Sequence, residues 1–399
     1  MERKMKAVWL CHFSSAEVQE QMGISGYNEV APWVPMAIRT IEACPWLEVY
    51  VVFPHPGVIG VKSFDLRGVH YTAFSFPHSK LHRFTHNKYF CSSEFCKSKK
   101  IVGEIVNQIN PDVVHCFGAE CGEISATFIP LMKKYPSILS VQGFIYKTNL
   151  PKRGTIKARI KIEKDILTNI KVAFTESKKQ GEDIRQFNPD IKLYWHFWGS
   201  YEILPAAPQP EKIYDLVFFA RLQKDKGLCD LIDAVAILKQ WKPDIRLCVI
   251  GGGDVESFRR YAGEAGVAEN VEFTGFLPTR EDVHLKAQQG RVSVLPTYND
   301  INPGTIVESM FLGIPVVTSD VDTNPEVNEK GEVLKLFPVG NVQALADAIR
   351  ELLSNPEVQK RLSEGARKRA YEMYAPTDEY LRQCLLNGYK CAIEEFDKR

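Results

Sequence analysis

The sequence predicts an α/β protein with two domains, each built on a doubly wound parallel sheet of the Rossmann-like type. Apolar stretches of strand length alternate with helical stretches along the chain. The length of 399 residues is more than one ordinary domain needs. Prolines at 205, 208 and 210 stiffen a short segment and interrupt both periodicities. We therefore expect an amino-terminal domain of residues 1–205 and a carboxyl-terminal domain of residues 206–375.

The amino-terminal half contains seven candidate strands, separated by helical stretches and turn residues. They are residues 6–13, 47–56, 69–76, 111–118, 137–143, 171–177 and 191–197. Alternation of this kind is typical of a parallel sheet with helical crossovers.

The carboxyl-terminal half repeats the pattern more regularly. Strands are expected at 215–220, 245–250, 271–275, 291–297 and 314–319. One helix is expected to begin at Lys226-Gly227, and another to run from Thr305 until Gly313 closes it. In open sheets of this kind, ligands bind at the carboxyl ends of the strands, so the loops that follow these strands are the candidate sites.

Two carboxylates stand at opposite ends of one such turn. Asp300 lies in the loop after the strand 291–297, and Glu308 lies on the helix that follows. A carboxylate accepts hydrogen bonds and so suits a ligand rich in hydroxyl groups. Taken alone, Asp300 could equally be a helix-capping residue and Glu308 a solvated helical carboxylate.

Between these carboxylates lie four residues at the expected helix start: Asn302, Pro303, Gly304 and Thr305. The first amides of a helix have no intrahelical partner, and the helix dipole places partial positive charge there. We expect this segment to receive an anion or a sugar hydroxyl.

A second cluster, Arg221 and Lys226, follows the strand 215–220. The planar fork of Arg and the compact charge of Lys, both near a helix start, can neutralise a departing nucleoside diphosphate without a metal ion. A lone Arg and Lys at a strand end are more often surface charges, but the acidic residues downstream favour the diphosphate interpretation.

These two clusters resemble the donor site of the retaining glycosyltransferases of family 4, also called glycosyl transferases group 1. The spacing Arg-Leu-x-x-x-Lys-Gly matches residue by residue, and two acids separated by seven residues precede Gly-x-Pro, with Asp300 where the family usually has Glu. The resemblance implies the GT-B fold, two Rossmann-like domains facing a central cleft. It also implies an acceptor in the first domain, and a final helix, from about 376 to 399, packed back on that domain.

The resemblance assigns roles in nucleoside diphosphate sugar binding. Arg221 and Lys226 would bind the pyrophosphate, Asp300 would orient the sugar and Glu308 would hold the ribose. Further donor contacts are expected from residues at the ends of other strands: Gly26, Gln142, Gly252, Phe276 and Leu277.

Several of these positions have an alternative interpretation. Gly26 and Gly23 could be turn residues, and Phe276 could belong to the core. Gly252 lies in a triple glycine after a strand, but no clean G-x-G-x-x-G follows, which disfavours an NAD site. Gln142 stands where the family often has His; it cannot act as a general base but can hydrogen-bond a sugar hydroxyl. His115, after a neighbouring strand, is more often a structural residue.

Composition excludes other classes. No stretch reaches the about eighteen apolar residues that cross a bilayer, and the first residues hold too short an apolar run for a signal peptide. We therefore expect a cytoplasmic protein. The ten cysteines show no zinc spacing and are interpreted as reduced thiols. No metal site and no cofactor beyond the sugar nucleotide are expected.

Charge is distributed unequally between the halves. Residues 1–205 carry 26 Lys and Arg against 19 Asp and Glu, whereas residues 206–399 carry 24 against 30. Basic residues gather at 78–100 and at 146–171, where a helix with Ile156, Ile160, Ile166 and Leu167 is expected. An anionic acceptor or the anionic inner face of a membrane would be attracted there; a solvated helix face is the alternative. Nucleic acid is not expected, because no recognition motif accompanies the charge.

Together these features predict a metal-independent retaining glycosyltransferase (a hexosyltransferase of class EC 2.4) that moves a sugar from a UDP- or GDP-linked donor to a saccharide, lipid-linked or other acceptor. Surface polysaccharide or glycolipid synthesis is the role implied by analogy. No residue presents itself as a nucleophile, so front-face attack is the expected route. The alternatives are a sugar-nucleotide-binding protein without catalysis, motivated by Gln142, Ile301 and Asn302, or an epimerase or phosphorylase of the same fold.

Overall fold

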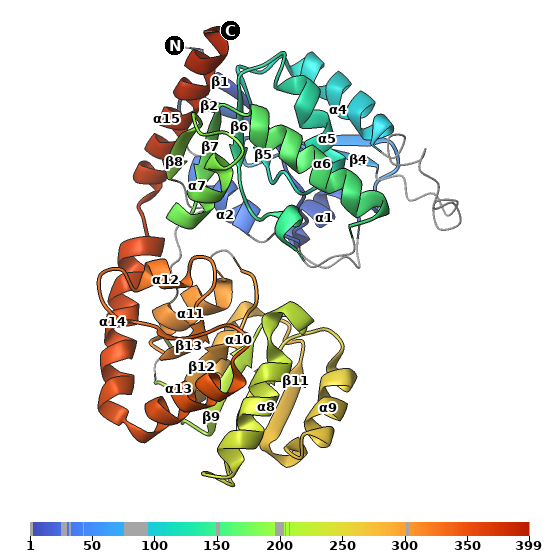
Figure 1. Cartoon of the computed structure of the whole chain (residues 1–399). Coiled ribbons are helices and arrows are strands. Elements are labelled where there is room, and N and C mark those ends of the chain that lie inside the picture. Colours follow the sequence, from blue (N-terminus) through green and yellow to red (C-terminus); the bar gives the residue numbers. More distant parts are fainter. Residues whose placement is uncertain are drawn as a thin grey trace. The chain divides into compact units, whose positions relative to one another are not determined.

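The computed structural model describes residues 3–24, 30–31, 33–42, 44–75, 95–148, 152–195, 203, 205–206, 208–300 and 303–398. The chain divides into two compact units (Figure 1). Unit 1 comprises Met1–Ser200 together with Thr377–Arg399, and unit 2 comprises Tyr201–Pro376. The division falls close to residue 205, where the sequence predicts the boundary, and each unit is described by itself.

Unit 1 contains an eight-stranded sheet in the order β3-β4-β2-β1-β5-β6-β7-β8. The strands are β1 (Met5–Leu10), β2 (Leu47–His55), β3 (Val61–Leu66), β4 (Val69–Ser75), β5 (Val113–Phe117), β6 (Ser137–Ser140), β7 (Val172–Thr175) and β8 (Lys192–Trp195). All pair in parallel except β3, which is antiparallel to β4. The sequence prediction missed β3 because its exposed residues, VKSFDL, lack the apolar signal of a buried strand.

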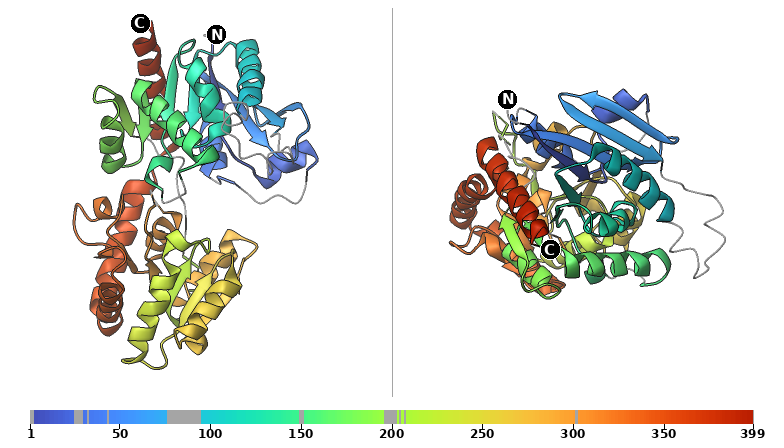
Figure 2. Two further views of the ribbon diagram at one scale, coloured as in Figure 1. Left: turned by 45° about the vertical axis from the view of Figure 1, so that its right-hand side comes forward. Right: turned by 90° about the horizontal axis from the view of Figure 1, so that it is seen from above.

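Helices cover both faces of this sheet. They are α1 (Ala16–Met22), α2 (Trp33–Ile41), α4 (Cys96–Ile109), α5 (Gly122–Leu131), α6 (Gly154–Asn169), α7 (Lys178–Arg185) and α15 (Asp378–Asp397). On one face α5 packs between α4 and α6, whereas α15 packs against α2, β5, β6, β7 and β8 (Figure 2). The helix expected in the basic segment is confirmed as α6, with Ile166 and Leu167 fully buried.

A buried polar network joins α15 to the middle of the sheet. The Trp9 indole Nε1 donates to the Tyr389 hydroxyl at 2.7 Å, and that oxygen lies 3.0 Å from His115 Nδ1. His115 Nε2 lies 2.7 Å from Ser140 Oγ. His115 and Tyr389 are completely buried. The structure therefore gives His115 a structural role, since both ring nitrogens are satisfied inside the core.

Tyr389→Phe is expected to lower the free energy of unfolding by about 1–3 kcal/mol, because it leaves the Trp9 N–H and His115 Nδ1 buried without their shared partner. Urea unfolding followed by circular dichroism measures the loss. The control is Tyr371→Phe at a ring that is 41% exposed, where a change within about 0.5 kcal/mol is expected. Equal stabilities of the two variants would show that the network contributes nothing.

Unit 2 contains a six-stranded parallel sheet in the order β11-β10-β9-β12-β13-β14. The strands are β9 (Tyr214–Phe219), β10 (Leu247–Ile250), β11 (Val271–Gly275), β12 (Gly290–Leu295), β13 (Val316–Ser319) and β14 (Lys335–Phe337). The helices are α8 (Leu228–Lys239), α9 (Val255–Glu264), α10 (Arg280–Ala287), α11 (Gly304–Leu312), α12 (Asn324–Val327), α13 (Val342–Ser354) and α14 (Pro356–Tyr374). Every strand predicted in this half is confirmed. Gly313 closes α11 in the left-handed conformation, with φ of 69°, as the sequence predicts.

Helices lie on both faces of this sheet as well. Contacts join α8 with α9 and α13 on one side and α11 with α10 and α14 on the other. The strands β9 and β12 lie side by side at the centre, and the strand order runs outward from them in both directions. This pair is the topological switch point of unit 2, where a doubly wound sheet binds its ligand at the carboxyl ends of the strands.

Candidate functional site at the β9–β12 switch point

The loop after β9 brings Arg221 and Lys226 to the switch point. Arg221 is exposed, and a 3-10 turn, Lys224–Lys226, leads into Gly227, which precedes α8. Gly227 has φ of 71°, and a Cβ there would lie 1.9 Å from the carbonyl oxygen of Pro296 after β12. Only glycine allows the two backbone segments to come this close. Their close contact brings Lys226 beside the loop that carries Asp300.

Lys226 and Asp300 form an ion pair. The Lys226 ammonium donates to Asp300 Oδ2, and the two side chains are only 14% and 19% exposed. Burial raises the pKa of Asp300, Lys226 opposes the rise, and the nearby Asp225 and Asp322 add to it. The simple alternative for Asp300 is therefore wrong: it does not cap the helix, because Pro303 occupies the N-cap position.

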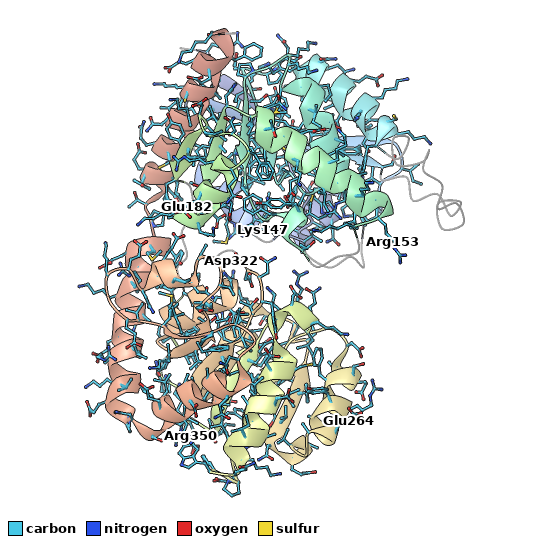
Figure 3. All side chains as sticks on the ribbon, viewed as in Figure 1. Lys147, Arg153, Glu182, Glu264, Asp322 and Arg350 are labelled. Carbon is cyan, nitrogen blue, oxygen red and sulfur yellow. The ribbon has the colours of Figure 1, made fainter. Side chains whose placement is uncertain are left out.

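Backbone contacts fix the loop around Asp300. Its amide donates to Asp322 Oδ2 at 2.9 Å, and Figure 3 labels this second aspartate. The amide of Tyr298 donates to the carbonyl of Asp225 at 2.8 Å, which links the loop after β12 to the loop after β9. The two loops thus hold the Lys226–Asp300 pair between them.

The start of α11 forms the next side of the site. Pro303 is the N-cap residue, and the helix begins at Gly304. The Thr305 hydroxyl donates to the backbone carbonyl of Phe219 at the end of β9, so the part of Thr305 that suits a ligand is its backbone amide. Asn302 lies outside the described residues.

Glu308 is held by two cationic or hydrogen-bonding side chains of α10. Arg280 pairs with Oε1, and His284 Nε2 lies 2.9 Å from Oε2. The Glu308 side chain is 12% exposed, so it is not a solvated helical carboxylate. Burial acts to raise its pKa, but the His284 hydrogen bond and the Arg280 charge outweigh burial and hold the pKa below its ordinary value.

Sequence reasoning did not identify Arg280 and His284. They are four residues apart on one helix and so share a face. This spacing was the sequence feature that could have identified them. The two acids of the site have opposed pKa shifts: upward for Asp300 and downward for Glu308. Both carboxylates accept a hydrogen bond from a cationic side chain: Asp300 from Lys226, and Glu308 from Arg280.

The glycine loop and the loop after β11 border the same edge of the sheet. Gly251 and Gly253 have φ of 149° and 141°, and a Cβ on either would meet backbone oxygen. A Cβ on Gly252 would meet only Phe276, at 3.6 Å. Phe276 is 76% exposed, so the core interpretation of this ring is wrong, and Leu277 beside it is half-buried.

The remaining candidates lie in unit 1. Gln142 follows β6 and is half-buried. Gly23 closes α1 with φ of 67°, which is a turn role. Gly26 lies outside the described residues.

Unit 1 holds two buried carboxyl groups that the sequence did not single out. Burial raises the pKa of Glu120, after β5, to about 7, and its Oε2 has no hydrogen-bond partner in the described part of the chain. Burial also raises the pKa of Glu163 on α6 to about 7, although this carboxylate accepts the amides of Ile145 and Tyr146 at 2.8 and 2.9 Å.

Because of these two carboxyl groups, we expect the free energy of unfolding to depend on pH. A carboxyl with a raised pKa stabilises the folded state below the unfolded pKa, and this contribution is lost as pH rises through the folded value near 7. Glu120→Gln is therefore expected to remove about 1–3 kcal/mol of the stability loss between about pH 5 and pH 8. Urea titrations at several pH values measure this difference, with Glu104→Gln, at an exposed position on α4, as control. An unchanged pH profile would contradict the buried-acid assignment.

Among the residues that the structure describes, no group of three or more His, Cys, Asp or Glu side chains is placed to hold a metal ion. None of the helices described is both long enough and apolar enough to cross a membrane.

The chain resembles known proteins most clearly over unit 2. Residues 202–369 match the family described as Glycosyl transferases group 1. Unit 2 belongs to the glycosyl transferases group 1 family. The match covers the switch-point strands, the loops with Lys226 and Asp300, and both α10 and α11. Similar curated proteins include a phosphatidyl-myo-inositol mannosyltransferase of Mycobacterium leprae, 33% identical over 170 residues, and the putative glycosyltransferase EpsD of Bacillus subtilis, 30% identical over 161 residues.

These alignments cover 41% and 40% of the chain and 44% and 42% of those proteins, so the chain matches less than half the length of its curated relatives. Solved structures extend the comparison to the whole fold. Sucrose-phosphate synthase from Thermosynechococcus elongatus has a TM-score of 0.72 at 15% identity, over 99% of this chain and 100% of the other. Anabaena HepE, in complex with UDP and glucose, has a TM-score of 0.69 at 14% identity, over 97% and 100%. The fold that contains the group 1 domain is therefore GT-B.

Proposed function

We propose that the protein is a retaining, metal-independent glycosyltransferase that moves a sugar from a UDP- or GDP-linked donor to an acceptor. The observation that carries the proposal is the set of groups at the β9–β12 switch point: Lys226 paired with Asp300 after the strands, and Glu308 on α11 paired with Arg280 and His284. The group 1 family membership of unit 2 and the UDP named in the HepE complex support a nucleoside diphosphate sugar as donor.

The mechanism follows from the charges. The diphosphate leaves with its charge stabilised by Arg221, by Lys226 and by the amides that begin α11. The Lys226 ammonium has three N–H donors and uses one on Asp300, which leaves two for phosphate oxygens. Asp300 orients the sugar through a hydroxyl group, and Glu308 holds the ribose. Attack by the acceptor on the same face gives retention, and trapping a covalent glycosyl-enzyme would contradict this route.

The acceptor binds unit 1 in this proposal. Exposed Lys157, Lys161 and Lys164 on α6, together with Arg153 before it (Figure 3), favour an anionic acceptor or a peripheral contact with an anionic membrane. The named relatives include an O-antigen chain mannosyltransferase of Escherichia coli, which supports a role in surface polysaccharide or glycolipid synthesis.

A second candidate is a sugar-nucleotide-binding protein without catalysis. Gln142 motivates it, since glutamine cannot serve as a general base. Binding of a sugar nucleotide without release of nucleoside diphosphate, across a panel of saccharide and lipid-linked acceptors, would favour this candidate over the transferase. Interconversion of the bound sugar without transfer would favour an epimerase.

Calorimetric titration with UDP, GDP, ADP and their sugars, without added metal, tests the donor site. We expect one base to be preferred, and we expect Arg221→Ala and Glu308→Ala to weaken binding by about tenfold or more. Exposed Arg259→Ala on α9 is the control. If no nucleotide binds, or if both variants bind as well as wild type, the transferase proposal is wrong.

A further inference from the structure

The carboxylate of Glu308 has an unusual set of neighbours. Each of its oxygens has a different partner from α10: Arg280 Nη2 on Oε1, and His284 Nε2 on Oε2 at 2.9 Å. The His284 side chain is 14% exposed, and that of Arg280 is 48% exposed. Because α10 presents both side chains from one face, four residues apart, the two contacts come from a single rigid element.

The carboxylate also has a defined direction. A Cβ built on Gly304 would lie 3.6 Å from Glu308 Oε1. The side chain therefore folds back over the first turn of α11, toward the carboxyl end of β12 and the ligand edge of the sheet. Two fixed partners on α10 prevent it from turning to other rotamers.

The hydrogen-bond inventory of this carboxylate leaves room for two more donors. An ionised carboxylate offers about four lone-pair sites, two on each oxygen. Arg280 uses one on Oε1 and His284 uses one on Oε2. One acceptor site remains on each oxygen, which matches the two adjacent hydroxyl groups of a ribose. Since Glu308 only accepts, His284 Nε2 carries the hydrogen in this arrangement.

We propose that Arg280 and His284 are positioning residues that orient the Glu308 carboxylate toward the 2′- and 3′-hydroxyls of the donor ribose, and thereby make the site select ribonucleotides over deoxyribonucleotides. This inference rests on the proposed function, because it requires a nucleoside diphosphate at the switch point. It adds two residues to the site and assigns them a specificity that the acidic motif alone does not specify.

The test compares UDP with 2′-deoxy-UDP, and GDP with 2′-deoxy-GDP, by calorimetry. Wild type is expected to bind the ribonucleotide about 10–100-fold more tightly than its 2′-deoxy analogue. His284→Ala and Arg280→Gln are each expected to lose most of this preference, while their affinity for the 2′-deoxy nucleotide stays within about threefold of wild type. His284→Gln, whose amide can still donate a hydrogen bond, is expected to retain part of the preference.

The matched control is Glu281→Gln, an exposed position on the same helix, which is expected to keep the wild-type ratio. Thermal unfolding of each variant verifies folding, and Arg280→Gln changes a half-exposed side chain, so it is the variant of choice if His284→Ala is unstable.

The outcomes separate this inference from the proposed function. Wild type that binds both forms equally would overturn the ribose inference and leave the transferase proposal intact. A His284→Ala variant that weakens both forms by the same factor would also overturn it, because that pattern indicates a purely structural role. Wild type that binds none of the nucleotides would overturn both proposals.

Discussion

Replacing Lys226 by alanine is expected to slow sugar transfer by about 10²–10³-fold, because it removes a preorganised positive charge from the departing diphosphate. It also leaves the carboxylate of Asp300, 19% exposed, without its ion-pair partner, at a cost of about 1–3 kcal/mol in unfolding free energy. The measurement is the rate of nucleoside diphosphate release at saturating donor, with the acceptor present, together with the unfolding free energy.

Two further variants separate the catalytic from the structural effect. The double variant Lys226→Met with Asp300→Asn removes both charges, so it is expected to recover most of the stability while remaining slow. Lys224→Ala, at an exposed position in the same 3-10 turn, is expected to change neither quantity appreciably. A single Lys226→Ala variant with wild-type turnover would show that this lysine does not act on the leaving group.

Gly251→Ala is expected to destabilise unit 2 by about 3–5 kcal/mol. Its φ is 149°, and the added Cβ would lie 1.9 Å from the carbonyl oxygen of Ala220 at the end of β9. The backbone at Ala220 cannot move away from this Cβ without disturbing β9, which is the central strand beside β12. Urea unfolding followed by circular dichroism measures the change.

The neighbouring Gly252→Ala is the matched control, because its added Cβ would come no closer than 3.6 Å to Phe276. We expect a stability change within about 1 kcal/mol there. If the two variants unfolded at the same denaturant concentration, the close approach of the glycine loop to β9 would be wrong.

Local sequence patterns predicted most strands and several helix ends of this fold. Hydrophobic periodicity located five of the six strands of unit 2, β9 to β13, but not the three-residue β14. Gly313 and Gly227 marked the end of one helix and the start of another. The edge strand β3 was missed because its side chains are exposed and lack that periodicity.

The candidate site was predicted in part. Lys226, Asp300 and Glu308 were singled out by their place after parallel strands and by the resemblance to the family. The structure pairs Lys226 with Asp300 and Glu308 with Arg280 and His284, and their roles in donor binding stay predictions. The sequence did not decide whether Phe276 is buried, because an aromatic residue after a strand can lie in the core or at the surface. Only the structure shows it exposed.

By itself the sequence determined the α/β class, indicated a division into two units near residue 205, and supplied the candidate residues of the switch point. The tertiary structure decided their partners. Lys226 pairs with Asp300 across 74 positions, and Trp9 donates to Tyr389 across 380. Propensity, periodicity and capping act over a few neighbouring residues, whereas such pairs form only after the chain has packed and removed the charges and polar groups from water. The opposed pKa shifts of Asp300 and Glu308 have the same origin, because burial and partner charges exist only in the folded state.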